Sequence, residues 1–189
     1  MVDFSTDIEN CLKTLQQGGV ILYPTDTVWG LGCDATNAAA AEKIMALKQR
    51  PPHKSFVVLV TGERDVLQYV AAPDLSVFDY LQTVEKPTTV IYEHALGLAE
   101  NVLADDGSVA MRICNDAFCR HLIKRFRKPI VSTSANISGQ PAPSIYAQIS
   151  PEIITGSGYV VQYRQDDATL AQPSAIVRWK NGQVEIIRK

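Results

Sequence analysis

Residues 20–32 read VILYPTDTVWGLG, and this stretch decides the fold. Its first four residues are apolar and partly β-branched, which predicts a buried strand. Pro24 has no amide hydrogen to donate to a neighbouring strand, so the chain must leave the sheet directly after it. The exit carries two hydroxyls and a carboxylate at 25–27, and Gly30 and Gly32 then let the backbone approach a ligand closely or adopt positive φ. Taken alone, the stretch is better explained by a capped turn without a ligand.

The composition is that of an ordinary globular protein. Its 189 residues are 46% hydrophobic and 20% charged, which predicts a single domain, 1–189, with a substantial core. The formal net charge of −2 argues against a surface built as a whole to bind nucleic acid, although it allows a local basic patch. The four cysteines lack zinc-ligand spacing. With neither a signal peptide nor an apolar run of about 20 residues, we expect a cytoplasmic protein with no membrane partner.

Hydrophobic periodicity and turn residues divide the chain into alternating helices and strands. The last two strands are joined by Asn181-Gly182, which is typical of a two-residue hairpin, so some antiparallel pairing is expected. These patterns predict an α/β fold, with mixed α+β layers around a mixed sheet. Helices are expected at 5–18, 37–47, 65–70, 76–84, 116–127 and 145–149, and strands at 20–23, 55–60, 88–92, 109–113, 129–132, 159–163, 175–179 and 184–188.

Three cations lie close together in the segment KQRPPHK at 48–54. Pro51-Pro52 stops the preceding helix and stiffens the link, so Lys48, Arg50 and Lys54 are held in fixed relative positions. Arg offers phosphate a bidentate fork and Lys a movable point charge, which predicts an anion site that holds a triphosphate. The alternative is a solvated surface cluster, which the segment taken alone favours.

A second hydroxyl-rich exit follows the strand expected at 129–132. Ser132, Thr133, Ser134 and Asn136 place hydroxyls and an amide at the end of that strand, where ligand sites commonly lie. A turn that satisfies its own backbone is the alternative. Four polar side chains within five positions exceed what such a turn requires, so binding of phosphate, ribose or a polar substrate is favoured.

The stretch at 24–32, the segment at 48–54 and STSAN at 132–136 resemble the signatures of the YrdC family of threonylcarbamoyl-AMP synthases, PT(D/E)TxxGLG, KxRP…K and SxSAN. The resemblance implies a twisted mixed sheet flanked by helices, in a short, single-domain form that ends after the core. It also implies synthesis of L-threonylcarbamoyl-AMP from L-threonine, bicarbonate or CO2, and ATP, with release of pyrophosphate. This product would feed the threonylcarbamoyladenosine modification of tRNA through downstream threonylcarbamoyl-transferase proteins.

The resemblance further implies roles for individual residues. Lys48, Arg50 and Lys54 are expected to be catalytic, and no residue is expected to bind metal. The chain has no Gly-rich phosphate loop, so side chains would hold the phosphates of ATP, and Mg²⁺ would enter with the nucleotide. The residues expected around threonine are Thr25, Thr27, Arg112 and Ser174. Those expected around ATP are Lys48, Arg50, Thr89, Ser132, Ser134, Asn136 and Arg188.

One segment departs from the family pattern. Where many members carry W-P-G-P-x-T, residues 84–89 read VEKPTT and keep only the last Pro and Thr. This departure predicts a reshaped loop around the nucleotide. The segment that closes the site is expected to be 48–54 or 139–144.

The alternative function is a non-catalytic module that binds double-stranded RNA or tRNA. It would use a basic stretch in the second half of the chain. The solvated face of an amphipathic helix is the favoured explanation of that stretch. Its cations are Arg112, Arg120, Lys124, Arg125, Arg127 and Lys128.

Overall fold

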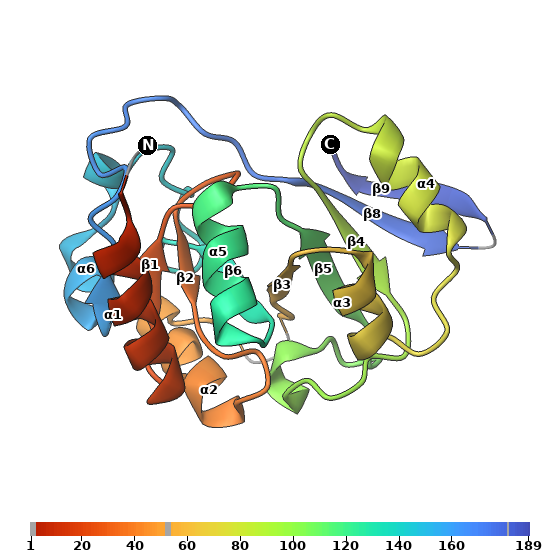
Figure 1. The fold of residues 1–189 in the computed structure, drawn as a ribbon, viewed down its shortest axis with the longest axis horizontal. Coiled ribbons are helices and arrows are strands. Elements are labelled where there is room, and N and C mark those ends of the chain that lie inside the picture. The colour runs from red at the N-terminus through yellow and green to blue at the C-terminus, as the bar shows by residue number, and fades with distance from the viewer. Residues whose placement is uncertain (1–2, 52–53, 181) are drawn as a thin grey trace.

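The computed structural model describes residues 3–51, 54–180 and 182–189, over which the chain forms one nine-stranded sheet with helices packed around it (Figure 1). The strands lie in the order β7-β1-β2-β6-β3-β5-β4-β8-β9. They are β1 (Ile21–Tyr23), β2 (Gly30–Gly32), β3 (Val57–Val60), β4 (Thr88–Tyr92), β5 (Val109–Ile113), β6 (Ile130–Ser134), β7 (Tyr159–Val160), β8 (Ala175–Lys180) and β9 (Gln183–Arg188). The helices are α1 (Ser5–Gln16), α2 (Ala38–Lys48), α3 (Glu63–Tyr69), α4 (Ser76–Thr83), α5 (Ala117–Phe126) and α6 (Pro151–Gly156), with 3₁₀ turns η1 (Glu100–Val102) and η2 (Tyr146–Gln148).

The sheet is mixed. Strands β1 and β7, β3 and β5, and β4 and β8 form parallel pairs, whereas the other neighbours are antiparallel. The closing hairpin is confirmed by the pairing of Lys180 with Gln183, although Asn181 itself lies outside the described residues, as do Pro52 and His53. The predicted α/β fold, a twisted mixed sheet flanked by helices, is confirmed.

Alternation along the strands gives the sheet two different faces. One face is covered by helices: α5 contacts β3 and α1, and the Tyr80 ring of α4 lies 5.6 Å from that of Trp179. A central row on this face is apolar and continuous across five paired strands, Val131, Val58, Met111, Val90 and Val177. The neighbouring row points to the other side and lines an open cavity, Ser132, Val57, Ala110, Ile91 and Arg178. The strands that build the core therefore also form the floor of the cavity.

The glycine-rich part of the opening stretch is a strand, which the sequence does not predict. Strand β2 pairs with β1, and neither Gly30 nor Gly32 has positive φ, so that part of the expectation is wrong. Gly30 lines the open cavity, so close approach of a ligand stays a prediction at that position. A Cβ atom on Gly32 would lie 2.6 Å from Cε1 of Tyr23 and 2.9 Å from the Val131 carbonyl oxygen. Glycine is required because the Tyr23 ring lies against it and donates its hydroxyl to that carbonyl (3.3 Å). The close approach at Gly32 is made by the protein's own core.

Two elements in the last third of the chain differ from the expectation. Where a helix is predicted at 145–149, only the turn η2 forms, and the helix is α6, which begins at Pro151. Proline fits there because the first amide of a helix has no intrahelical partner. The strand predicted at 159–163 is reduced to β7, because the amides of Gln162 and Tyr163 donate to the buried carboxylate of Asp7 instead (2.9 Å each).

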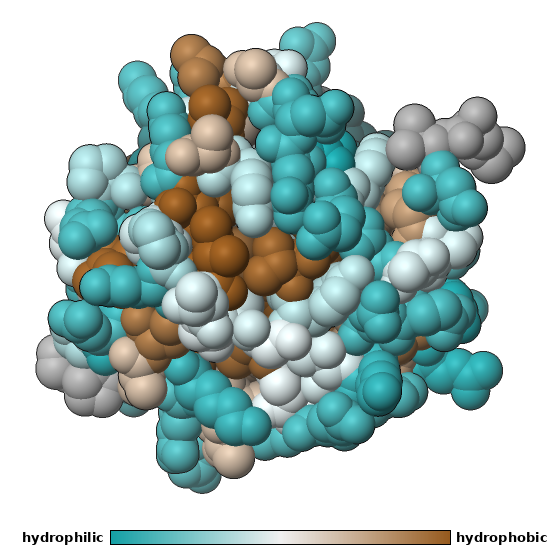
Figure 2. Space-filling model, turned by 90° about the vertical axis from the view of Figure 1, so that its left-hand side faces the viewer, coloured by the Kyte–Doolittle hydropathy of each residue, from teal (hydrophilic) through white to brown (hydrophobic). Residues whose placement is uncertain are grey.

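The side of the molecule on which α1 and α6 lie is shown in Figure 2. Hydrophobic side chains lie there in a hollow that hydrophilic ones surround. The outer strand β9 also leaves Ile186 and Ile187 exposed. Within the described residues, each helix is too short or too polar to cross a lipid bilayer.

Candidate active site

The cavity over the open face of the sheet has a volume of about 480 Å³, within the range typical of small-molecule sites. Its lining draws on segments that lie far apart in the sequence, including Thr27, Arg50 and Ser134. Among the described residues that line it, four are cations and one is a carboxylate. These are Arg50, Arg112, Arg178 and Arg188, and Asp106. The excess of positive charge favours an anionic ligand.

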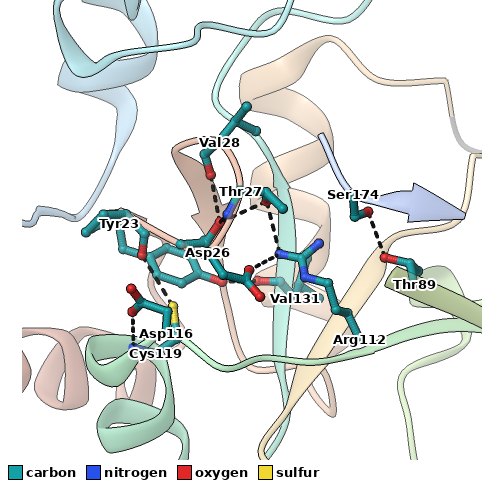
Figure 3. A network of polar contacts seen from close by, with 12 residues as sticks. Tyr23, Asp26, Thr27, Val28, Thr89, Arg112, Asp116, Cys119, Val131 and Ser174 are labelled. Atoms are coloured by element: carbon teal, nitrogen blue, oxygen red, sulfur yellow. Dashed lines mark hydrogen bonds and ion pairs between the residues drawn. The ribbon is translucent and has the colours of Figure 1, made fainter. Parts of the chain in front are cut away.

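The turn after β1 divides its two threonines between the core and the cavity. Thr25 is buried, and its hydroxyl accepts from the Thr27 amide (3.0 Å) and donates to the Val28 carbonyl (2.8 Å). Thr25 therefore closes the turn, which is the alternative that the sequence left open. Thr27 lines the cavity, where its hydroxyl accepts from Arg112 Nη2 (3.2 Å; Figure 3).

Arg112 lies one residue before the end of β5, lines the cavity and is 4% exposed. Its Nη2 donates to Asp26 Oδ1 (2.9 Å) and to the Thr27 hydroxyl, so the turn after β1 holds the guanidinium in place (Figure 3). Its buried Nε has no hydrogen-bond partner within the described part of the chain. A buried donor without an acceptor is costly, and an anion in the cavity would supply one.

Ser174 and Arg188 form the wall beside Arg112. The Ser174 hydroxyl lies 2.9 Å from the hydroxyl of Thr89, which is fully buried in β4. The backbone carbonyl of Ser174 accepts hydrogen bonds from Arg188 Nη2 (2.8 Å) and Nε (3.1 Å). Burial and the nearby charge of Arg112 lower the pKa of Arg188. Two guanidinium groups that repel each other across a cavity are stabilised by an anion between them. Thr89 lies behind Ser174 and does not line the cavity.

The end of α2 turns Arg50 into the cavity. Gln49 adopts the left-handed conformation (φ 50°, ψ 44°) that ends the helix. The Arg50 guanidinium then lies 4.6 Å from the centre of the Phe56 ring and donates to the carbonyls of Lys54 (3.2 Å) and Ser55. Burial lowers the pKa of Arg50. Lys54 itself is exposed and does not line the cavity, so only its backbone contributes to the site.

The loop after β6 also divides between the cavity and the core. Ser132 and Ser134 line the cavity. The Asn136 amide points elsewhere and donates to the carbonyls of Ile137 (2.9 Å) and Gln140 (2.8 Å). Lys48 is 1% exposed, does not line the cavity, and donates to the backbone carbonyls of Ser134 and Asn136.

Sequence reasoning missed several residues that line the cavity. Arg178 adds a positive charge and Asp106 a negative one, and Ser55 and Ser108 also contribute. A signal for Arg178 was present, because positions 174, 176 and 178 share one face of an extended strand. Its partner across the sheet is Ile91, and that pairing of β4 with β8 is not visible in the sequence.

The basic stretch that would bind RNA is largely occupied within the fold. Arg112 is buried, and Arg120 donates to the carbonyls of Thr61 (2.7 Å) and Cys114 (3.3 Å). Arg125 pairs with Glu9, and Lys128 pairs with Asp34 (2.6 Å). Four of the six cations are therefore tied to protein partners.

Comparison with known proteins extends over the whole chain. The threonylcarbamoyl-AMP synthase of Pseudoalteromonas translucida (strain TAC 125) is 34% identical over 187 residues, which cover 97% of this chain and 98% of the relative. That of Saccharophagus degradans (strain 2-40 / ATCC 43961 / DSM 17024) is 37% identical over 148 residues, 75% of each protein.

Solved structures share the fold at lower sequence identity. P. abyssi Sua5 complexed with L-threonine superposes with a TM-score of 0.87 at 18% identity, covering all of this chain. This chain spans 55% of the length of that protein. E. coli YciO gives a TM-score of 0.82 at 19% identity, covering 97% of this chain and 89% of YciO. The model of the Sua5, YciO and YrdC family, described as telomere recombination, matches residues 13–189, and the chain belongs to this family.

Proposed function

We propose that this protein forms L-threonylcarbamoyl-AMP from L-threonine, bicarbonate or CO2, and ATP, and releases pyrophosphate. Relatives named threonylcarbamoyl-AMP synthase match it over nearly their whole length. A structural neighbour is a complex with L-threonine, a substrate of this reaction. The observation that carries the proposal is the buried Arg112, which lines a cavity together with three further arginines and whose Nε has no hydrogen-bond partner among the described residues.

The threonine end of the site is proposed to lie around β5 and β8. Arg112 would pair with the carboxylate of threonine, because a guanidinium group offers fork-shaped donors to a carboxylate, whereas Arg188 stays assigned to ATP. The hydroxyls of Thr27 and Ser174 would bind its polar groups. Thr25 and Thr89 contribute from behind, through their hydrogen bonds to Thr27 and Ser174.

The nucleotide end is proposed to lie around α2, β3 and β6. Arg50 would neutralise phosphate charge, while Ser132 and Ser134 would donate hydrogen bonds to the nucleotide. Within the described residues, no cluster of three or more potential metal ligands is present. We propose that Mg²⁺ enters bound to the triphosphate oxygens, which are its preferred kind of ligand.

The chemistry requires alignment more than a strong base. The amine of threonine adds to CO2 and loses a proton, which gives a carbamate. A carbamate oxygen then attacks the α-phosphorus of ATP, and the bond to pyrophosphate breaks. Both reactants are anions, so the arginines of the cavity would reduce their repulsion and hold them in line.

The product would then be consumed in the modification of tRNA. A mixed anhydride of this kind reacts readily with nucleophiles, so downstream threonylcarbamoyl-transferase proteins are proposed to transfer its acyl group to tRNA. We place this activity in the cytoplasm, with tRNA as the final acceptor. Direct binding of tRNA or double-stranded RNA is the alternative function. The contacts of Arg120, Arg125 and Lys128 with other protein groups do not favour it.

The test is an assay of pyrophosphate release. Release from ATP is expected only when threonine and bicarbonate are both present, and serine is the competitor to compare. Arg50→Ala should lower the rate by ~10²–10³-fold, as for loss of one well-placed donor to transition-state charge. Arg125→Ala is the matched control, because Arg125 pairs with Glu9 at the surface. Salt-sensitive RNA binding without pyrophosphate release would reject the proposal.

A further inference from the structure

The two cations of the segment at 48–50 have opposite surroundings. Arg50 lines the cavity, whereas Lys48, two positions earlier, is among the largest fully buried side chains. The left-handed Gln49 between them ends α2 and separates their directions. A K-x-R pattern therefore does not place two equivalent cations on one ligand.

Three hydrogen bonds tie the end of α2 to the loop at 134–138. Lys48 Nζ donates to the carbonyl oxygens of Ser134 and Asn136, the latter at 2.6 Å. The Lys48 carbonyl accepts from the Ser138 amide (2.7 Å). These bonds fix the backbone on both sides of Ala135, directly behind the position from which Ser134 lines the cavity.

A phosphate contact by Lys48 would dismantle this arrangement. The ammonium group has a third N–H, but Lys48 is buried and does not line the cavity, so its side chain would have to move away from the two carbonyl oxygens to reach a phosphate there. Burial, and then the charge of Arg50, lower the pKa of Lys48 to about 7. A neutral amine still has two N–H groups for two carbonyls, but it no longer offers charge to a phosphate.

We propose that Lys48 is a positioning residue that holds the loop at 134–138 against α2, and that of the pair only Arg50 contacts the phosphates of the nucleotide. This assignment rests on the proposed function, because it takes the cavity to be a nucleotide site. Lys48 then acts on the nucleotide only through the placement of Ser134.

The discriminating measurement is the affinity for ATP and for AMP in three variants. Lys48→Met should weaken both nucleotides by about 10-fold to 100-fold and leave the ratio of their affinities unchanged, since a loosened loop harms every nucleotide alike. Arg50→Met should weaken ATP more than AMP, because it removes a phosphate contact. Lys43→Met is the matched control, because Lys43 on the same helix also donates to a backbone carbonyl, that of Gly18, but is exposed. Selective loss of ATP affinity in Lys48→Met would overturn the proposal.

A second measurement does not depend on the folding of a variant. Limited acetylation of the unaltered protein, read by mass spectrometry, should modify the exposed Lys54 quickly and the buried Lys48 slowly, with or without ATP. Rapid acetylation of Lys48 that ATP blocks would reject the positioning role. A failure of the proposed function would show itself separately, as a lack of threonine-dependent pyrophosphate release.

Discussion

The turn at 25–27 and the loop at 134–138 both place a hydroxyl at the cavity, but different side chains hold their backbones. The turn presents the hydroxyl of Thr27 to the cavity, and Ser134, the last residue of β6, presents its hydroxyl where the loop begins. The turn is closed from within, by the hydroxyl of Thr25. The loop is held from outside, by the amine of Lys48 on α2. In both regions, therefore, a buried side chain that does not line the cavity holds the backbone of the residue that does. Because this side chain is a hydroxyl in Thr25 and an amine in Lys48, the two regions should respond differently to mutation and to pH.

The largest effect is expected at Arg112, which the turn at 25–27 holds. In Arg112→Gln, the rate of pyrophosphate release should fall by ~10²–10³-fold, because a charged donor aimed at the reacting anions is lost. The Michaelis constant for threonine should also rise more than that for ATP. Steady-state kinetics with each substrate varied in turn measures both effects. Equal changes for the two substrates would place Arg112 away from the threonine end.

Comparison of Thr25→Val with Thr27→Val distinguishes the role of Thr25, which closes the turn, from the role of Thr27, which lines the cavity. Thr25→Val should lower the free energy of unfolding by about 1–3 kcal/mol, because a buried amide and a buried carbonyl lose their partner. Thr27→Val should instead raise the Michaelis constant for threonine. Urea unfolding and steady-state kinetics of both variants check the pair. The comparison fails if Thr27→Val is the more unstable variant.

These predictions also show how far the sequence could specify the site. Apolar runs bounded by turn residues predicted β4 and β5 with their observed bounds, since local pattern and burial agree there. Strand β2 was missed because its glycines have no β propensity, and it forms only where Tyr23 packs on Gly32. Formation of β2 therefore depends on a tertiary contact and not on the local sequence.

Motifs predicted which segments meet but not which side chain of each segment faces the cavity. Lys48 and Arg50 differ because Gln49 is left-handed, and a glutamine carries no signal for that conformation. Arg178 enters the cavity through pairing of β8 with β4, which brings together residues far apart in the chain. Backbone conformation at single residues and non-local register were therefore the missing information.

The loop held by Lys48 should make stability depend on pH, unlike the turn at 25–27. The pKa of Lys48 is lowered to about 7 in the folded protein, so between that pH and the usual lysine value the unfolded chain binds more protons. The free energy of unfolding must then rise with pH through this window, by at most about 1.4 kcal/mol per pH unit. The same contribution is lost as the pH falls towards 7. Urea unfolding at several pH values should show this slope in the unaltered protein and not in Lys48→Met. A slope of equal size in both proteins would assign it to another group.

The smallest expected effect concerns Gln49, the residue that sends Lys48 inward and Arg50 outward. Its φ of 50° strains any residue with a Cβ, whereas its amide and that of Arg50 close the helix by donating to Ala46 (3.1 Å) and Met45 (2.8 Å) carbonyls. Gln49→Gly keeps both bonds and removes the strain, so the free energy of unfolding should rise by about 0.5–1 kcal/mol, with pyrophosphate release unchanged. Gln49→Val should lower both quantities, because a β-branched residue resists this conformation. Thermal melts and the pyrophosphate assay test the pair together. If Gln49→Val were as stable and active as the unaltered protein, the end of α2 would not control the directions of Lys48 and Arg50.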